Sequence, residues 1–544
     1  MDLSRKRVLV VDDHPGMLNT MRRALEMCGI SGAHMVRSAH EAVARLRNMR
    51  YDIVLADYDL GPGPDGQQLL EHCRAENLLA PTAIFVMVTA ERAYDRVMSA
   101  AEATPDDYLV KPFTEEMLRL RLARALDRSR VLGVVRELHA KGQHEALVQA
   151  CERLAAKEPQ HALELTRMKG DALLALNRWR EALDVFGQVV QSRPLPWARL
   201  GVARAYAGLD DVEQARRSLT ELLADAPEFL AAYDCLADLH RRCLNDDDAK
   251  AVLNMAIEVS PNILRRHKVV GDIALRMNDL ETAERALSTV VRKGRHAFTR
   301  SPDDHLKLSR IYMEREKYPQ ALDTLAEAKK AFHASPAVKA SACAVETLIH
   351  SKANNPREAR RTLDEALAAA KASDRPLDPA SAIELAQACY LHHREHDAVA
   401  LVEQVVANNH DDLDLLKDVR SMYDKLDRKD QGEILIDRCV NDAVSINNEG
   451  VLRAKNGDLN GAIELLEEAA RSMPDNVQIV MNAAHSLIVY MQLHGVQPDK
   501  LKQVQTYLER VEERNPTHPK FLQVLALQDQ LLKTKAANRK EAAA

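Results

Sequence analysis

The chain has 544 residues, of which 46% are hydrophobic and 29% charged, and its formal net charge is −6. A single hydrophobic core rarely grows to this length, so several domains or a repeat array are expected. The negative balance disfavours a nucleic-acid binder, and the sequence contains no stretch of about 18 apolar residues that would span a membrane.

The N-terminal residues and the cysteines indicate a reducing compartment. Residues 1–7 are charged and lead directly into an apolar run, which is unlike a signal peptide. The eight cysteines form no CxxC pair and lie within apolar helical patterns, for example at Cys151 and Cys439. Buried, reduced thiols are therefore expected, and with them a cytoplasmic protein.

The first 125 residues or so alternate short apolar runs with helical patterns. Strands are predicted at 8–11, 53–56, 83–88 and 108–110, with a weaker one at 34–36. The stretches between them have helical periodicity, at 17–28, 40–48, 66–77, 91–102 and 114–127. Short apolar strands separated by helices predict a parallel sheet covered on both faces, and thus a small doubly wound α/β domain over residues 1–128.

Polar residues follow four of these strands. Asp12 and Asp13 end the first strand, Asp57 the third, Thr89 the fourth and Lys111 the fifth. The carboxyl ends of parallel strands share one edge of a sheet, so these side chains are expected to meet in one crevice. Crowded carboxylates repel one another unless a cation joins them, and Mg²⁺ prefers such oxygen ligands.

This set of residues suits phosphoryl transfer. Asp57 would present an ionised, nucleophilic oxygen to phosphorus without the help of a base. Lys111 and Thr89 would hold phosphoryl oxygens. Taken singly, each residue has an ordinary explanation: Asp12 and Asp13 could cap a helix, and Asp57 could close a turn. Only their joint placement at strand ends indicates a site.

The constellation resembles the receiver domain of two-component response regulators, the CheY-like family. Asp13 and Asp57 are 44 residues apart and Thr89 and Lys111 are 22 apart, as in that family. The resemblance implies a flavodoxin-like, five-stranded parallel sheet of order 2-1-3-4-5. It also implies that Asp57 is the phosphoacceptor and that Asp12, Asp13 and Asp57 bind Mg²⁺.

Further roles are implied by the same resemblance. The backbone carbonyl of Asp59 would complete the protein ligands of the metal, and Thr89 and Tyr108 would form the switching pair. The Lys111–Pro112 peptide bond would be cis. Asp59 and Glu91 occupy positions at which the family tunes the lifetime of the phosphoryl group.

One segment departs from the family pattern. The loop from Asp57 to Gly66 is about one residue longer than usual and contains two prolines, Pro62 and Pro64. The loop still borders the site, so the chemistry should survive. Donor recognition or phosphoryl lifetime is expected to differ.

Beyond residue 130 the strand signal disappears and a repeat of about 34 residues begins. A small residue recurs and is followed four positions later by a large apolar one. The small residues are Ala146, Ala182, Ala215, Ala249, Ala283, Ala321, Ala359, Ala398, Gly432 and Ala462. The small side chain lets two helices approach closely, and the residue one turn later fills the gap. Prolines about twelve residues after several of these positions would end each unit.

The repeat resembles the tetratricopeptide family, most clearly where Gly170 to Leu173 are followed by Trp179, Ala182, Phe186 and Pro194. The resemblance implies an all-α superhelix of about ten repeats over 134–520, degenerate between 283 and 440. Residues 129–133 would be a helical connector, with Arg128 and Arg130 on a helix that continues from one domain into the next. Residues 521–544 would form a terminal helix and a disordered basic tail. A generic helical bundle is the alternative, but the near-constant period disfavours it.

The two resemblances together predict a response regulator of a two-component phosphorelay, with a domain order similar to regulators of the VieB type. Phosphorylation of Asp57 would control protein–protein interactions of the repeats, as an adaptor or an inhibitor of a signalling partner. The expected partners are a sensor histidine kinase or phosphotransfer protein, a protein or peptide bound by the repeats, and a second copy of the chain.

Two other classes of function are disfavoured. A DNA-binding transcriptional regulator would need a helix-turn-helix with a basic recognition helix, and the sequence has neither. A C-terminal enzyme would need a nucleotide loop, metal motif or nucleophile elbow, and none appears. The only chemistry expected is the receiver's own phosphoryl transfer and dephosphorylation.

Overall fold

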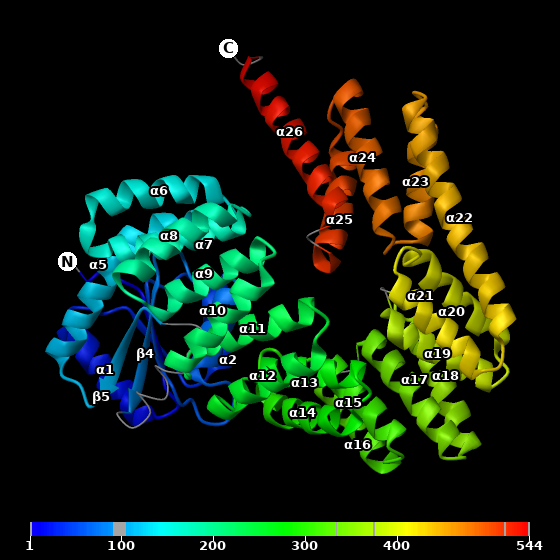
Figure 1. The fold of residues 1–544 in the computed structure, drawn as a ribbon, viewed down its shortest axis with the longest axis horizontal. Helices are drawn as coiled ribbons and strands as arrows, with labels where there is room; N and C mark the ends of the chain where they lie inside the picture. Colours follow the sequence, from blue (N-terminus) through cyan, green and yellow to red (C-terminus); the bar gives the residue numbers. More distant parts are fainter. Residues whose placement is uncertain (1–2, 91–104, 333–334, 374–375, 516–517, 542–544) are drawn as a thin grey trace. The chain divides into compact units, whose positions relative to one another are not determined.

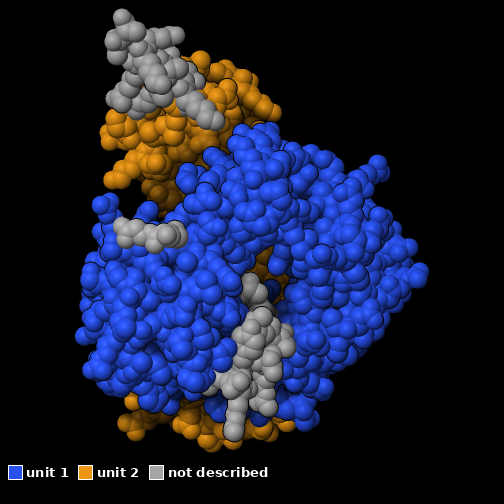
Figure 2. Space-filling model, turned by 90° about the vertical axis from the view of Figure 1, so that its left-hand side faces the viewer, with its two compact units in different colours: residues 1–311 blue, residues 312–544 orange. Residues whose placement is uncertain are grey.

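The computed structural model describes residues 3–90, 105–332, 335–373, 376–515 and 518–541. The chain divides into two compact units, Met1–Ile311 and Tyr312–Ala544, which Figure 2 distinguishes by colour. The first unit holds an α/β domain and a series of helix pairs. The described residues of the second unit form helices and their connections.

The α/β domain has the predicted fold (Figure 1). Five parallel strands form one sheet of order β2-β1-β3-β4-β5. The strands are β1 (Val8–Val11), β2 (Ala33–Val36), β3 (Ile53–Asp57), β4 (Ile84–Ala90) and β5 (Asp107–Lys111). The helices are α1 (Pro15–Met27), α2 (Ala39–Asn48), α3 (Gly66–Ala75) and α5 (Glu115–Ala140). The helix predicted at 91–102 lies outside the described residues.

Alternation along the strands divides the core between the two faces of the sheet. Val8, Val10 and Leu55 pack with α1 and α5 on one face. Leu9 and Val54 face the other side and pack with α2 and α3. Successive side chains of a strand point to opposite faces, so a strand that is apolar throughout needs helices on both sides.

Local signals fix where the helices of this domain begin. The side chain of Ser38 accepts a hydrogen bond from the backbone N–H of Glu41 at the start of α2. Asp65 and Gln68 form a capping box at the start of α3. These side chains satisfy N–H groups that have no partner within the helix.

Helix α5 belongs to both the sheet domain and the first repeat. It runs without a break from Glu115 to Ala140, through the segment expected to connect the domains. The C-terminal half of α5 is hydrogen-bonded to the sheet domain at the residue that precedes β5, Asp106. Arg136 donates to the Asp106 carboxylate at 2.6 Å, and Arg128 donates to the Asp106 carbonyl at 2.9 Å. Arg128 also pairs with Glu164 of the second helix that follows, α7 (Ala162–Ala175), with one bond of 2.8 Å.

Helix pairs follow α5 in the first unit. They are α6 (His144–Lys157), α7 (Ala162–Ala175), α8 (Trp179–Ser192), α9 (Pro196–Gly208), α10 (Val212–Asp225), α11 (Leu230–Arg242), α12 (Asp246–Val259), α13 (Leu264–Arg276) and α14 (Leu280–Lys293). Two short 3₁₀ turns, η1 (Pro159–His161) and η2 (Gly294–His296), lie among them. Helix α15 (Pro302–Glu314) crosses the boundary between the units.

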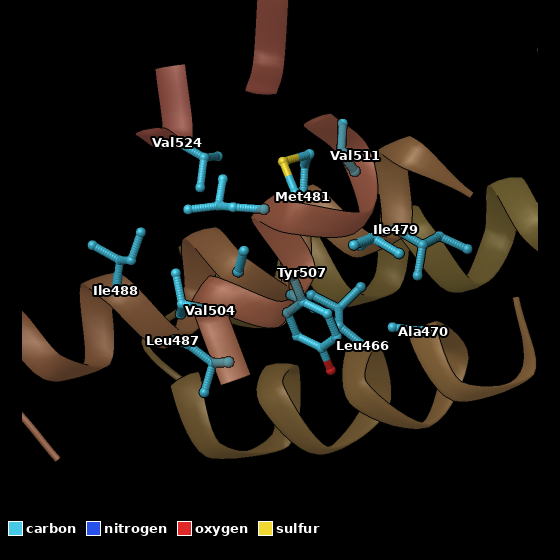
Figure 3. Close-up of a cluster of buried hydrophobic side chains, with 14 of the residues drawn as sticks. Leu466, Ala470, Ile479, Met481, Leu487, Ile488, Val504, Tyr507, Val511 and Val524 are labelled. Carbon is cyan, nitrogen blue, oxygen red and sulfur yellow. The ribbon is translucent and has the colours of Figure 1, made fainter. Parts of the chain in front are cut away.

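The second unit continues the series of helices. They are α16 (Tyr318–Ala331), α17 (Pro336–Lys352), α18 (Pro356–Lys371), α19 (Pro379–Leu391), α20 (Glu395–Asn408), α21 (Leu413–Lys425), α22 (Lys429–Lys455), α23 (Leu459–Ser472), α24 (Val477–His494), α25 (Pro498–Arg514) and α26 (Pro519–Glu541). Some helices of this unit are longer, such as the 27-residue α22. Its C-terminal helices enclose a core that includes Leu466, Ile479, Leu487 and Val504 (Figure 3).

A left-handed turn residue marks the period of the repeats. Residues with positive φ recur at the turn inside successive helix pairs: Gly142, Asn177, Asp210, Leu244, Asn278, Glu316, Asn354, His393, Asp427 and Gly457. From the second turn onward, the predicted small residue lies five positions later and is buried in every case, from Ala182 to Ala462. The large residue four positions further on is buried as well.

The contacts at Phe186 show why small residues are needed. An added Cβ on Gly170 would lie 2.4 Å from the Phe186 ring, and one on Gly201 would lie 2.5 Å from it. The ring therefore fills the space between two helices that approach closely because each presents only hydrogen there.

Two sequence expectations for the repeats need correction. The first small residue was expected at Ala146, but Ala146 is exposed, and Leu147 (1% exposed) occupies the buried position. Leu147 lies five positions after the left-handed residue Gly142, which is the same spacing as in the later pairs, so the predicted register of this first unit was one residue too early. Near the C-terminal end of the repeats, α22 continues past the position at which one helix pair was expected to end and the next to begin. Val444 stands twelve residues after Gly432, where several other units have proline, and α22 continues through it.

Within the described part of the chain, no helix combines the length and apolar character that crossing a bilayer requires.

The cysteines are expected to differ sharply in reactivity. Cys73 is fully buried, and burial raises the pKa of its thiol to about 12. Cys243 is exposed. At pH 8 a maleimide should label Cys243 within minutes, while Cys73 should react at least about 100-fold more slowly because so little thiolate is present. Mass spectrometry of labelled peptides would measure both rates, and equal rates would contradict the packing of α3 on the sheet.

Candidate functional site

The polar residues at the strand ends include a buried ion-pair cluster. Lys111, the last residue of β5, donates to Asp57 Oδ2 at 2.7 Å and to Asp12 Oδ2 at 3.1 Å. Asp12 is 3% exposed, and the Asp57 side chain is 13% exposed. Three strands thus bring one ammonium group and two carboxylates together at the carboxyl edge of the sheet.

Asp13 lies beside this cluster and is more open. Its carboxylate is 2.7 Å from Nδ1 of His14, and its carbonyl accepts a bond from Arg37 at 3.3 Å. Ligand atoms of Asp12, Asp13 and His14 all lie within 4.8 Å of one another. The backbone N–H of His14 donates to Asp12 at 2.9 Å, which fixes that carboxylate. These oxygens form an acidic group able to hold a divalent cation.

Burial and charge act in opposite directions on the two central groups. Burial raises the pKa of the Asp57 carboxyl, and the hydrogen bond and charge of Lys111 oppose that rise. Burial alone would lower the pKa of Lys111, but its bonds to Asp57 and Asp12 outweigh burial and raise it. The Lys111 amine is therefore protonated and positively charged beside the two carboxylates.

The loop after Asp57 is tied closely to the strand end. The N–H of Tyr58 donates to the Val88 carbonyl at 2.8 Å, and the N–H of Gly66 donates to the Tyr58 carbonyl at 2.9 Å. A Cβ on Gly66 would lie 2.2 Å from the carbonyl oxygen of Asp57. The start of α3 therefore rests directly against the backbone of the residue that carries the central carboxylate.

The longer loop places glycine where other residues would be strained. Gly61 has φ +70° and Gly63 has φ +144°. A Cβ on Gly61 would also lie 2.8 Å from the Asp13 carboxylate. The Asp59 side chain accepts a bond from the Gly61 N–H at 3.1 Å, so it is engaged within the loop.

The remaining expected site residues have these positions. Thr89 is 1% exposed near the end of β4. Tyr108 is 8% exposed, and its ring packs in the core cluster on the α2–α3 face. The Lys111–Pro112 peptide bond is cis. Glu91 lies outside the described residues.

Two features of the site region had weak or no signals in the sequence. His14 was not singled out, although it directly follows the aspartate pair that it contacts. Phe298, more than 200 residues along the chain, packs against the sheet domain. His14 could have been found from its position beside the two aspartates. Nothing in the local sequence pattern marks Phe298.

This α/β fold and its acidic edge define the class of protein, a receiver domain joined to helical repeats. The family model of the response regulator receiver domain matches residues 8–123, and that of the tetratricopeptide repeat matches residues 167–228 and 348–412.

Individual relatives match the receiver part. The chemotaxis protein CheY of Pseudomonas aeruginosa is 30% identical over 122 residues, which is 22% of this chain and 97% of CheY. The alginate biosynthesis transcriptional regulatory protein AlgB of the same species is 38% identical over 121 residues, but this chain spans only 26% of AlgB. The chain therefore belongs to the CheY-like response regulator receiver family.

Solved structures resemble each part separately. A sensor protein from Polaromonas sp. JS666 is 27% identical and aligns with 23% of this chain and 98% of its own, with a TM-score of 0.21. The tetratricopeptide protein YrrB, described as having an unusual peptide-binding site, is 14% identical over 34% of this chain and 91% of its own, with a TM-score of 0.29.

The contact between Gly66 and Asp57 gives a testable prediction. Gly66→Ala should lower the opening free energy of the sheet domain by about 1–3 kcal/mol, because the added methyl group overlaps the Asp57 carbonyl. Hydrogen exchange of the buried β3 amides in the full chain would measure this.

Gly16→Ala is the matched control, because a Cβ there would meet nothing within 4 Å and alanine favours the helix. Equal protection in the two variants would show that α3 does not rest on Asp57 as described.

Proposed function

We propose that this chain is a phosphorylation-controlled adaptor in which Asp57 accepts a phosphoryl group and the repeats bind a protein or peptide. The contact of Lys111 with both Asp57 and Asp12 is the observation that carries the proposal. One ammonium group neutralises only part of the charge of Asp12, Asp13 and Asp57. The remaining negative charge favours a divalent cation, and the oxygen donors suit Mg²⁺.

The proposed transfer step uses the carboxylate, ammonium and hydroxyl groups at the strand ends. An Asp57 carboxylate oxygen attacks the phosphorus of a phosphohistidine on a sensor kinase or phosphotransfer protein. The P–N bond breaks as the new P–O bond forms, and the departing imidazole takes up a proton. Lys111 and the Thr89 hydroxyl hold phosphoryl oxygens. Bound Mg²⁺, held by Asp12, Asp13, Asp57 and the Asp59 carbonyl, would neutralise developing charge. Attack of water on phosphorus later releases inorganic phosphate and restores Asp57.

The repeats supply the output in this proposal. Stacked helix pairs offer extended surfaces that bind other proteins. The phosphoryl group carries about −1.5 to −2 charges and replaces the single negative charge of the Asp57 carboxylate, so the site becomes more negative and gains acceptor oxygens that can shift a receiver between two arrangements. A second copy of the chain is a further candidate partner.

Phosphorylation can be tested with acetyl phosphate and Mg²⁺ on the full chain. The wild type should gain one hydroxylamine-sensitive label, and Asp57→Asn should gain none, because the acyl phosphate forms on that carboxylate. Chelation of Mg²⁺ should reduce labelling at least about 10-fold, since the cation stabilises the transferring group.

Asp52→Asn serves as the control. Asp52 is also an aspartate of the β3 region, but it pairs with Lys6 at 2.8 Å. This variant should label like the wild type. Label retained in Asp57→Asn, or absent from the wild type, would contradict the proposal.

Regulation of binding can be tested by affinity capture from the native cell, with the wild type and Asp57→Ala as baits. At least one interaction should change by roughly 5-fold or more, which corresponds to a modest coupling free energy between two sites. Identical partners bound with identical affinity would refute control by the receiver.

A transcription factor that binds DNA directly is the alternative. A gel shift at low salt should show no retained DNA, because binding to DNA phosphates relies on positive charge and this chain has a formal net charge of −6.

A further inference from the structure

The α2–α3 face of the receiver is contacted by the chain's own repeats. Phe298, just after η2, stacks on His72 of α3 with ring centroids 4.1 Å apart and planes 10° apart. Its ring also lies 5.0 Å from that of His40 in α2. Phe298 packs against the core cluster of the sheet, so a repeat residue extends the receiver's own core. Residues 260–299 are termed the docking segment.

Polar groups surround this aromatic contact. A cavity of about 550 Å³ lies between the domains, with Tyr58, Asp65 and Glu71 on the receiver side and Asn262 and Arg265 on the repeat side. The receiver wall is acidic and the repeat wall carries a cation. Complementary charge of this kind favours one docked arrangement over others.

Arg266 adds a buried positive charge at the same place. It is 1% exposed and donates two bonds to Asp234, at 2.9 and 2.8 Å. Burial raises the pKa of the Glu71 carboxyl, and the charge of Arg266 acts against that rise. The two opposite charges therefore attract each other between α3 and α13.

The receiver is attached to the repeats at a second, separate place. Helix α5 runs into the first repeat, and Arg128 joins the Asp106 carbonyl to Glu164 of α7. The helices from α8 to α12 connect this attachment to the docking segment. Figure 1 shows this series of helices curving past the receiver within the first unit. Repeats of a solenoid otherwise contact only their neighbours, so the receiver adds a long-range constraint on their curvature.

The docking contact is linked by covalent and hydrogen bonds to the phosphorylation site. Tyr58 directly follows Asp57 and lines the cavity. The Tyr58 carbonyl accepts the Gly66 N–H at 2.9 Å, and Gly66 begins the helix that carries His72. A rearrangement of the loop after Asp57 must therefore move the cavity wall, the start of α3, or both.

We infer that the receiver holds α8 to α12 in one curvature, and that phosphorylation of Asp57 releases the docking segment from the α2–α3 face. The inference rests on the proposed phosphorylation of Asp57. The docked contact coexists with Asp57 paired to Lys111. A phosphoryl group draws Lys111 and the neighbouring loop toward itself, so the arrangement that fits the docking segment is lost. The released repeats relax, and their partner surface changes shape.

Hydrogen exchange of the full chain, measured by mass spectrometry with and without acetyl phosphate and Mg²⁺, tests this inference. In the wild type, labelling of Asp57 should accelerate exchange in α3 and in residues 294–300 roughly two- to tenfold, as expected for loss of an aromatic contact. Asp57→Asn should show no acceleration. Phe298→Ala should show the faster exchange without any phosphoryl donor.

Phe229→Ala is the matched control. Phe229 is also partly buried in a connection between helix pairs, but it packs against the repeat cluster around Leu219. This variant should leave exchange in α3 unchanged. Undiminished labelling of Asp57 in Phe298→Ala would show that its receiver still folds.

The outcomes separate the two proposals. If Asp57 takes the label but exchange in α3 and residues 294–300 stays constant or slows, this inference is overturned and the proposed function stands. Unchanged exchange in Phe298→Ala would overturn it as well. If Asp57 takes no label, the proposed function fails and this inference fails with it.

Discussion

The ammonium group of Lys111 sets the character of the acidic edge, because it lies between carboxylates that would otherwise repel each other. Its bonds to Asp57 and Asp12 join the ends of β5, β3 and β1. Helices on both faces keep water from the sheet beneath, so the charge is only partly screened. A carboxylate in such a place is held in position and still reaches the surface through its 13% exposed side chain. Those are the properties that a phosphoryl acceptor requires.

The repeats are stabilised by a different constraint, the close approach of helices at residues with little or no side chain. Phe186 lies against Gly170 and Gly201, and the same pairing of small and large residues recurs along the chain. Each pair is closed by a residue in the left-handed conformation, often asparagine, aspartate or glycine. Those residue types adopt positive φ at low cost. The cost is higher at Leu244, which is 89% exposed, so the packing of the helices on either side of the turn must offset it.

These two constraints explain which features of the fold and the site could be predicted from the sequence and which could not. The strands, the small–large period and the family motifs were predicted because each depends on residues close together in sequence or on a regular interval. The strand order joins segments far apart in sequence, such as β1 and β3, and was predicted only through the family resemblance. The position assigned to Ala146 was wrong because Leu147 takes the place of the usual alanine, and the neighbouring alanine set the register one residue too early. The unbroken α22 was missed because the absence of a proline at Val444 is a weak signal. The contact of Phe298 with His72 could not be predicted from the sequence. It depends on the curvature of several successive helix pairs, and small rotations at each pair accumulate.

That accumulation also bears on the inferred control of the repeats by the receiver. Since each repeat touches only its neighbours, a small change at each interface alters the whole curve, and no single repeat resists it strongly. A rigid domain attached at two separate places limits all the intervening interfaces at once. One attachment here is covalent and continuous through α5, whereas the other is an aromatic and electrostatic contact of modest strength. Only the weaker one lies on the helix that begins against Asp57. If Asp57 is phosphorylated as proposed, the chemical change occurs next to the attachment that we infer to open, while the continuous attachment through α5 keeps the receiver in place.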